Sequence, residues 1–336
     1  MSPLRLSLAC WDYDRVKAIE DGRVKPEGID LTFLNFRVEE TFFRQLRFQE
    51  FDVSEMSLSS YVLTLNGPEL PFIALPVFPS RFFRHQSIYI NTKAGIQSPA
   101  DLAGRRVGTP EFQMTAPVWQ RGILEDEYGL KYDAPKYFTG SVESSTVERK
   151  EKVPLKLADS VQIQAIPKGK CLAQMLADGE IDCLQSATAP STFGTHPDVG
   201  RLFPNAKEVE QDYFKRTGIF PIMHVIVVKR SVLKENPWVA QELTKAFARS
   251  LEYAYDAIHE RGALRYILPW MQFHVEETQA ALCSDGNDRW WEDGLTPQNT
   301  RTLDKFLEYS YNQGLANKRW QVKELFAPGS LEAFVV

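Results

Sequence analysis

The order of strand and helix patterns along the chain constrains its fold more than any other feature. Through the first 80 residues, short apolar or alternating runs typical of strands take turns with segments that have helical spacing of apolar residues. The expected strands cover residues 4–10, 29–36, 51–54 and 71–78, and the expected helices cover 14–19, 39–51 and 57–65. Such alternation predicts a mostly parallel sheet with helices on both faces, which is an α/β fold.

The same pattern then begins again, which predicts a second α/β domain. Further strands are expected at 87–91, 106–109, 181–184 and 225–229, and further helices at 98–102, 114–128, 169–178 and 236–261. The polar stretch 141–168 is interpreted as an excursion from the second domain. A length of 336 residues suits two domains, because a typical domain has about 150 residues.

Composition and charge argue against several classes of protein. Hydrophobic residues make up 43% and charged residues 25% of the chain, as in ordinary globular proteins. The 39 basic residues are outnumbered by 44 acidic ones, which argues against nucleic acid as a partner. No apolar run approaches the roughly 18 residues that a membrane span needs. The apolar stretch Leu6–Cys10 is too short for a secretory signal, so we expect a cytoplasmic protein without a membrane partner.

The cysteines give no sign of a metal site or a disulfide framework. Cys10, Cys171, Cys183 and Cys283 form no CxxC pair, and no histidine stands at a metal-site spacing from them. We expect free, buried thiols, and we expect neither a metal nor another cofactor. One metal set stays open, namely Asp12, Glu55 and His85 assembled across the fold.

Four segments, spaced along most of the chain, resemble the type 2 periplasmic-binding-protein fold. They are Gly28–Leu31, Phe51–Ser57, Ser98–Gly108 and Leu176–Cys183. The resemblance implies an α/β, two-lobed type 2 periplasmic-binding-protein-like fold with a ligand cleft between its lobes. In that fold the first lobe is discontinuous. We therefore expect lobe I to comprise residues 1–88 and 218–336, and lobe II to comprise residues 89–217.

Within that fold, four other segments are similar to the 4,5-dihydroxyphthalate decarboxylase family: Leu8–Asp14, Val77–His85, Gly108–Glu111 and Gly218–His224. The similarity implies a cytoplasmic carboxy-lyase that converts a dihydroxylated aromatic dicarboxylate, such as 4,5-dihydroxyphthalate, to protocatechuate and CO2 without a cofactor. The alternative is a non-catalytic solute-binding protein of an ABC transporter for a small organic anion. A third hypothesis is an enzyme of another class on this scaffold, such as a pyrimidine synthase for thiamine. The sequence is compatible with a homo-oligomer.

The decarboxylation chemistry calls for a proton donor next to the carbon that loses its carboxylate. In open α/β sheets, ligands meet the carboxyl ends of strands. Glu55 follows a short strand there and could serve as the acid; the alternative is a helix-start residue. His85 and His224 stand where the chain is expected to cross between lobes, and each could move a proton or be packed structurally. Asp12 is the fourth catalytic candidate, with a turn or cap role as its alternative.

The substrate also needs cations and hydrogen-bonding groups. Arg81 and Arg84 are candidates for the carboxylates, because a guanidinium binds a carboxylate through two parallel hydrogen bonds. If the strand continued, alternation would place Arg81, Phe83 and His85 on one face. The helix start from Thr109 to Thr115 could hold a carboxylate on free backbone N–H groups. The other candidates are Ser57, Gln185 and Ser186 as hydrogen-bonding residues and Phe83 and Phe220 as covers for the ring; each has a structural role as its alternative.

Overall fold

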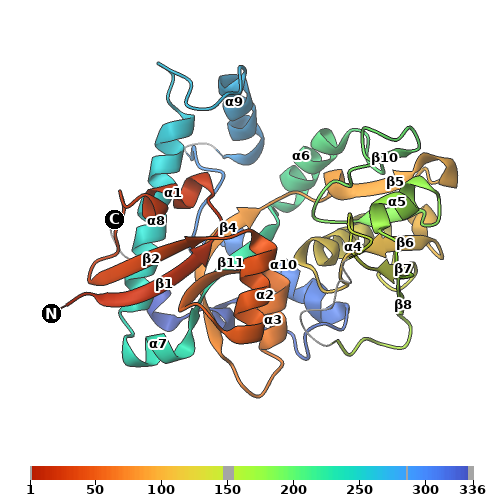
Figure 1. Ribbon diagram of the computed structural model, residues 1–336. Helices are drawn as coiled ribbons and strands as arrows, with labels where there is room; N and C mark the ends of the chain where they lie inside the picture. Colours follow the sequence, from red (N-terminus) through yellow and green to blue (C-terminus); the bar gives the residue numbers. More distant parts are fainter. Residues whose placement is uncertain (1, 147–154, 285–286, 332–336) are drawn as a thin grey trace. The chain divides into compact units, whose positions relative to one another are not determined.

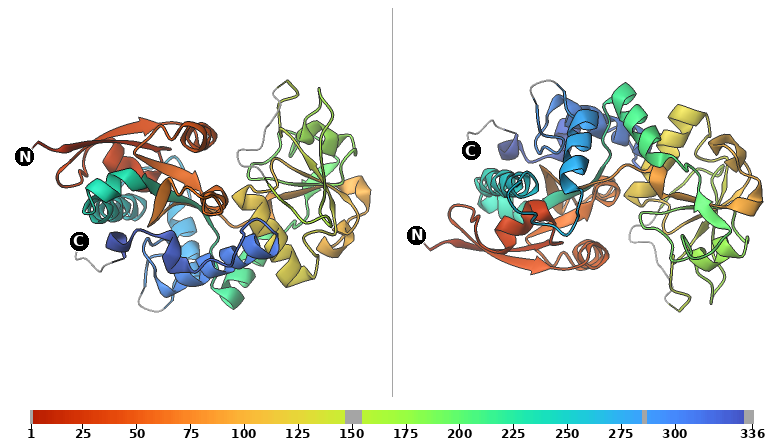
Figure 2. Two further views of the ribbon diagram at one scale, coloured as in Figure 1. Left: turned by 90° about the horizontal axis from the view of Figure 1, so that it is seen from below. Right: turned by 90° about the horizontal axis from the view of Figure 1, so that it is seen from above.

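The structure is a computed structural model that describes residues 2–146, 155–284 and 287–331 (Figure 1). The chain divides into two compact units, each of which is α/β. Unit 1 comprises Met1–Arg81, Phe214–Leu303 and Gln321–Val336, and unit 2 comprises Phe82–Tyr213 and Asp304–Trp320. Figure 2 shows the units from two further sides.

This division differs from the one expected from the sequence in two main places. Residues 82–88 and 304–320, which were expected in lobe I, group with unit 2. The reason for the second difference is aromatic packing within unit 2. The rings of Phe306 and Tyr309 lie 5.5 and 5.6 Å from that of Trp119, measured between ring centroids.

Unit 1 is built on a five-stranded sheet in the order β2-β1-β3-β11-β4. Strand β1 is parallel to β2 and β3, whereas β11 is antiparallel to β3 and β4. Helices connect the parallel strands, as the sequence alternation predicts. The strands are β1 (Leu4–Cys10), β2 (Ile29–Asn35), β3 (Val53–Ser57), β4 (Phe72–Arg81) and β11 (Ile222–Lys229), and the connecting helices are η1 (Asp14–Val16), α1 (Lys17–Glu20), α2 (Val38–Phe48) and α3 (Leu58–Thr64).

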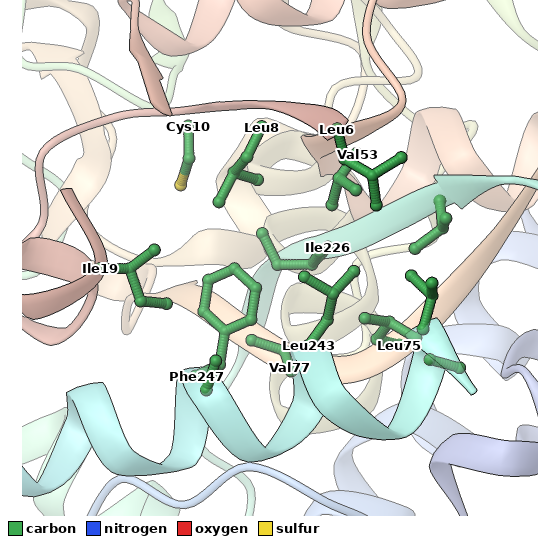
Figure 3. Packing of buried hydrophobic residues seen from close by; sticks show 14 of the residues in the cluster. Leu6, Leu8, Cys10, Ile19, Val53, Leu75, Val77, Ile226, Leu243 and Phe247 are labelled. Carbon is green, nitrogen blue, oxygen red and sulfur yellow. The ribbon is translucent and has the colours of Figure 1, made fainter. Parts of the chain in front are cut away.

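The core of unit 1 lies between this sheet and helix α8 (Val239–Ile258). Side chains alternate between the two faces of a strand, so Leu6, Leu8 and Cys10 of β1 point to the same face. Figure 3 shows them together with Val53, Leu75 and Ile226, opposite Leu243 and Phe247 of α8. Burying one such side chain stabilises the fold by roughly 1.5–3 kcal/mol.

Shorter elements complete unit 1. They are α7 (Arg230–Glu235), α9 (Met271–Leu282), η5 (Val322–Leu325) and η6 (Pro328–Ser330). Helix α10 (Pro297–Asn312) begins in unit 1 and ends in unit 2, while α6 (Ala206–Thr217) begins in unit 2 and ends in unit 1. None of the described helices is both long and apolar enough to cross a membrane.

Unit 2 has a six-stranded sheet in the order β10-β5-β9-β6-β7-β8. Strands β9, β6, β7 and β8 are parallel to one another, and β5 is antiparallel to both of its neighbours. Strand β8 lies in the stretch interpreted as an excursion; residues 147–154 of that stretch are outside the described residues. The elements are η2 (His85–Ser87), β5 (Ile88–Asn91), η3 (Thr92–Ala94), η4 (Pro99–Leu102), β6 (Arg106–Thr109), α4 (Thr115–Tyr128), β7 (Lys136–Thr139), β8 (Gln162–Ala165), α5 (Leu172–Ala177), β9 (Cys183–Gln185) and β10 (Val199–Arg201).

The strand predicted through Arg81, Phe83 and His85 is wrong. Strand β4 ends at Arg81, and a short 3-10 helix begins at His85. The last ladder pair of β4 joins Arg81 to Ile222, the first residue of β11. Beyond this pair β4 has no neighbouring strand, so the chain leaves the sheet, and the alternation that would share a face among these residues does not apply.

Candidate functional site

Neighbouring strands of unit 1 bring Glu55 and His224 together. Strand β11 runs antiparallel to β3, with Ile226 opposite Glu55 and His224 opposite Ser57. Residues two apart on a strand share a face, so both side chains point to the same side of the sheet. The His224 Nδ1 and Glu55 Oε1 atoms lie 2.6 Å apart. Both residues are candidates from the sequence, but the local pattern carries no sign that they are partners.

The Glu55 carboxyl group is completely enclosed, with 0% of its side chain exposed. The Tyr13 hydroxyl donates to Oε1 at 2.7 Å, and the Trp11 backbone N–H donates to Oε2 at 3.3 Å. The Cys10 thiol lies 3.8 Å from Oε2. These partners satisfy the hydrogen-bonding capacity of the carboxyl group within unit 1. Glu55 is therefore placed to hold His224 rather than to touch a ligand.

His224 differs from Glu55 because 16% of its side chain is exposed. A carboxylate only accepts hydrogen bonds, so the shared hydrogen belongs on Nδ1 of the imidazole. This leaves Nε2 as the nitrogen that can exchange a proton with a ligand, as in other carboxylate–histidine pairs. The ring of Phe42 packs edge-on against the imidazole, with 4.9 Å between centroids, and supports its orientation.

Tyr13 and Arg15 extend this cluster, and neither is among the candidates predicted from the sequence. Burial and the neighbouring Glu55 raise the pKa of the Tyr13 phenol far above its ordinary value, so the hydroxyl stays a hydrogen-bond donor. The Arg15 guanidinium stacks between the rings of Tyr13 and Trp291, at 4.3 and 4.2 Å from their centroids. It also donates to the Pro79 carbonyl at 2.5 Å. The sequence signal that could have identified Tyr13 and Arg15 is their position directly after β1.

Cys10 lies beside the same carboxyl group. Burial, followed by the repulsion from Glu55, raises the pKa of this thiol well above its ordinary value. Because the thiolate is the reactive form of cysteine, Cys10 is a packed thiol rather than a nucleophile in this environment. The structure records all four cysteines as free, with Cys10 and Cys183 buried and the other two partly exposed.

The Arg81 guanidinium makes its hydrogen bonds to other residues of unit 1. Its Nη2 donates to the Glu292 carbonyl at 2.8 Å and to Asn299 Oδ1 at 2.6 Å. Burial lowers the pKa of this guanidinium to about 10. Its guanidinium carbon also lies 5.7 Å from the centroid of Phe220, a buried ring that packs edge-on against Trp291. Because these partners enclose both side chains, the structure gives no support for Arg81 or Phe220 as ligand contacts.

Arg84 and His85 belong to unit 2 and are also buried. Arg84 donates to the Ala187 carbonyl at 3.1 Å and stacks on Phe82. The His85 ring packs against Phe203 and Tyr213, each with 5.3 Å between centroids, and its Nδ1 lies 3.9 Å from Glu210. This environment favours the packed, structural alternative for His85, and it makes Arg84 a buried residue of unit 2 rather than a surface arginine.

The remaining unit 1 candidates have different surroundings. Asp12 is exposed in the loop after β1. Ser57 is the N-cap of α3, and its hydroxyl accepts from the Ser60 N–H at 3.4 Å. Throughout the described residues, no group of three or more His, Cys, Asp or Glu side chains is arranged to hold a metal ion. In the metal set that the sequence leaves open, Asp12 and Glu55 belong to unit 1, whereas His85 belongs to unit 2.

In unit 2 the predicted hydrogen-bonding residues gather at the carboxyl ends of β6 and β9. The two strands are parallel neighbours, with Gly108 beside Leu184, so the register continues to Thr109 beside Gln185. Thr109, Thr115, Gln185 and Ser186 are all buried, whereas Phe83 is half-buried. Two buried polar residues that the sequence analysis did not select, Glu111 and Gln113, lie in the same turn.

Unit 1 also contains a cavity of about 270 Å³. Arg15, Tyr255, Met271 and Trp291 are among the residues of its wall, whereas Glu55 and His224 are not. The cavity therefore adjoins the arginine of the cluster but does not contain the carboxylate–histidine pair.

Comparison with known proteins connects these features to a family. No family model matches the chain. Among solved structures, the aliphatic sulphonate binding protein SsuA from Escherichia coli aligns with a TM-score of 0.55 at 10% identity, covering 98% of this chain and 99% of that one. The desulfurization enzyme DSZB aligns with a TM-score of 0.51 at 14% identity, covering 98% of this chain and 97% of that one. These similarities confirm the predicted periplasmic-binding-protein-like fold and indicate nothing about activity.

The curated relatives are far more similar in sequence. A 4,5-dihydroxyphthalate decarboxylase from Comamonas testosteroni is 39% identical over 337 aligned residues, with all of both chains covered. A second protein of that name, from Pseudomonas putida, is 42% identical over 216 residues, covering 64% of this chain and 83% of that one. The full-length match confirms the resemblance found in the sequence: the chain belongs to the 4,5-dihydroxyphthalate decarboxylase family, an enzyme family of carboxy-lyases.

Proposed function

We propose that this chain decarboxylates 4,5-dihydroxyphthalate to 3,4-dihydroxybenzoate (protocatechuate) and CO2. The names of the two relatives support the substrate and the reaction. The observation that carries the proposal in this chain is the 2.6 Å contact between His224 and an enclosed Glu55. Such a pair supplies a proton donor with a fixed orientation, which is the group that this decarboxylation requires.

The proposed reaction balances without an oxidant or reductant. His224 Nε2 gives its proton to the ring carbon that bears the departing carboxylate, and a new C–H bond forms there. The hydroxyl para to that carbon supplies electron density during protonation. The C–C bond to the carboxylate then breaks, CO2 leaves, and the bonding electrons restore the aromatic ring. The imidazole regains its proton from water before the next turnover.

Other residues support this step without taking part in it. Glu55 is a positioning residue that acts through His224, and Tyr13 holds Glu55 in turn. We assign Arg15, rather than Arg81 or Arg84, to a substrate carboxylate. Its Nε and Nη1 donate to Pro79 and Asp14, but Nη2 has no hydrogen bond to any described residue. In this proposal the electron-rich ring of the substrate makes a cofactor unnecessary.

The test is direct measurement of turnover. Purified protein with 4,5-dihydroxyphthalate should release equal amounts of CO2 and 3,4-dihydroxybenzoate. H224N should lower kcat by about 10²–10⁴-fold, the usual contribution of a positioned acid or base, while 3,4-dihydroxybenzoate still binds. The control is H196N, because His196 is a partly exposed histidine of unit 2 and is outside the His224 cluster. Normal turnover by H224N would contradict the assignment of the proton donor.

The solute-binding alternative has less support. SsuA is similar at only 10–14% identity, which shows the fold alone. A protein that is thermally stabilised by 4,5-dihydroxyphthalate but releases no CO2 would favour this alternative.

We also propose a cytoplasmic location, because the four free cysteines suit a reducing compartment.

We further propose that the chain associates with a second copy of itself through an apolar segment at 264–273 in unit 1. Six large apolar side chains of this segment are exposed: Leu264, Tyr266, Ile267, Leu268, Trp270 and Phe273. Since large side chains bury about 150–250 Å² each, these six expose on the order of 700 Å². A stable interface buries roughly 800 Å² on each partner, so the segment supplies most of the area that a homo-oligomer needs.

A further inference from the structure

Three buried glutamine side chains of unit 2 lack a partner for their carbonyl oxygens. The Oε1 atoms of Gln113, Gln120 and Gln185 are inaccessible to solvent and accept no hydrogen bond within the described part of the chain. All three residues are at most 1% exposed. Leaving a buried acceptor without a donor is unfavourable, and such groups are rare in folded proteins. A set of three in one unit therefore calls for an explanation.

The orientation of the Gln113 and Gln120 side-chain amides is fixed by the hydrogen bonds that their Nε2 groups donate. Gln113 donates through Nε2 to Glu111 Oε2 at 2.9 Å, and a carboxylate can only accept. Gln120 donates through Nε2 to the carbonyls of Ser87 and Ser186, at 2.8 and 3.2 Å. Turning either amide around would bring two acceptors into contact. The free end of each side chain is therefore an acceptor.

The fold brings this set together at the carboxyl ends of β6 and β9. Gln185 ends β9 and Thr109 ends β6, and the residues before them, Leu184 and Gly108, are paired. Gln113 lies four residues after Thr109, just before α4 begins. Gln120, on α4, bonds to Ser186, the residue after Gln185. In parallel sheets this edge is where ligands bind.

A buried arginine holds the turn that carries Gln113 in place. Arg121 of α4 donates through Nη2 to the Phe112 carbonyl at 2.6 Å, and its guanidinium lies 3.8 Å from the centroid of the Phe112 ring. Its Nε donates to Gln313 Oε1 at 2.9 Å. Because these partners come from the same unit, the turn is built in advance of any ligand, as a binding site requires.

We infer that unit 2 carries a subsite for phenolic hydroxyl groups, in which the side-chain oxygen of Gln113 accepts a hydrogen bond from the ligand and the buried amide of Gln185 supplies a second contact through its oxygen. Acceptors bind a group that donates, so a hydroxyl suits them and a carboxylate does not. Glu111 adds a carboxyl group in the same turn, which disfavours a carboxylate further. The choice of a dihydroxylated ring as ligand rests on the proposed function. The subsite departs from the carboxylate that the sequence analysis expected at residues 109–115.

The experiment compares two ligands that differ only in their hydroxyl groups, 3,4-dihydroxybenzoate and benzoate. Isothermal titration calorimetry gives the Kd of each for the full chain and its variants. Q113M and Q185M remove the acceptors with little change in volume. Each should weaken 3,4-dihydroxybenzoate up to about tenfold, the value of one hydrogen bond, and change benzoate by less than twofold. Q164M is the matched control, because Gln164 is exposed on β8.

Several results would overturn the inference. One is that the wild-type protein fails to prefer 3,4-dihydroxybenzoate over benzoate. Another is that both variants weaken the two ligands equally, which indicates general damage to the unit. A third is that neither variant changes either Kd, which shows that only water binds the side-chain oxygens of Gln113 and Gln185. The assay needs no turnover, so its failure is distinguishable from failure of the proposed decarboxylation, which release of CO2 by the wild-type protein tests separately.

Discussion

At the scale of single residues, Glu55 illustrates how burial decides a role. A carboxyl group that is fully enclosed and whose oxygens already have hydrogen-bond partners within the unit is not available to a ligand, but it can fix the imidazole that we propose as proton donor. We expect E55Q to lower kcat about 10–100-fold, as loss of a residue that orients a functional group often does. KM should change by less than threefold, because substrate contacts are retained. Steady-state kinetics with 4,5-dihydroxyphthalate measure both constants.

The matched control for that variant is E27Q, since Glu27 is an exposed glutamate of the same unit. Y13F should show a smaller loss of kcat than E55Q. It removes one donor to Glu55, while the contacts with His224 and the Trp11 N–H stay. A rise in KM without a fall in kcat in E55Q would show that Glu55 binds substrate and does not position His224.

Glu210 leads to a prediction about stability. Burial is the main cause that raises its pKa from 4.5 to about 7, although Gln86 donates to it and Arg84 lies near. The folded state thus keeps this proton at pH values where the unfolded chain has lost it. Stability must fall as the pH rises from about 4.5 to 7, by up to about 3 kcal/mol from this group. The Nδ1 atom of His85 also lies 3.9 Å from the Glu210 carboxyl group.

The E210Q variant isolates this effect, because glutamine has no proton to lose. Urea unfolding should give the variant and the wild type similar free energies of unfolding near pH 4. The variant should gain on the wild type as the pH rises to 8. Other titrating groups are common to both proteins and cancel in the difference. If the two stability profiles stay parallel from pH 4 to 8, the buried carboxyl group does not have this pKa.

The sequence could locate candidate residues but not their surroundings. Glu55 was selected because it follows a predicted strand, and His224 because it stands where the chain is expected to cross between lobes. Their contact depends on the antiparallel pairing of β3 with β11, strands that lie about 170 residues apart in the chain. Arg81 was selected for its charge, yet its partners Glu292 and Asn299 come from a distant segment. Local sequence pattern does not show which distant segments pair, so contacts such as these can be identified only from the three-dimensional structure.

At the scale of elements, strong local patterns were predicted well and weak ones were not. Helix α4 was expected from residue 114 and begins at Thr115, because apolar periodicity and the following Gly129, in a left-handed conformation, mark its ends. The strands β7 and β8 and the three-residue strand β10 were missed. Strand β8 has the sequence Gln-Ile-Gln-Ala at the sheet edge and is mostly exposed, so it lacks the apolar run by which buried strands are recognised.

At the scale of the whole molecule, the division into units shows where local analysis fails. Two α/β units follow from the repeated alternation, but the membership of residues 304–320 does not. Helix α10 continues from one unit into the other, and directly after its end, within unit 2, Gln313 accepts from Arg121 and donates to the Val118 carbonyl of α4. A helix that serves two cores has an uninterrupted pattern, so the sequence carries no boundary signal there.

The apolar segment 264–273 leads to the last prediction, which concerns assembly. Ile267 is fully exposed and Trp270 is 66% exposed, so burial of these side chains against a second copy would remove much apolar surface from water. The double variant I267D/W270E places two charges on this surface. It should shift the wild-type oligomer to a smaller species in sedimentation-velocity analysis, because a buried unpaired charge strongly disfavours association.

The control for this variant is F48D. Phe48 is exposed to the same extent as Trp270 and also lies in unit 1, but it is outside the segment, at the end of α2. The F48D variant should keep the mass of the wild type. A monomeric wild-type protein, or a double variant that keeps the wild-type mass, would show that this surface does not join two copies. The association of the wild type should also weaken on dilution, because the fraction of associated chains depends on protein concentration.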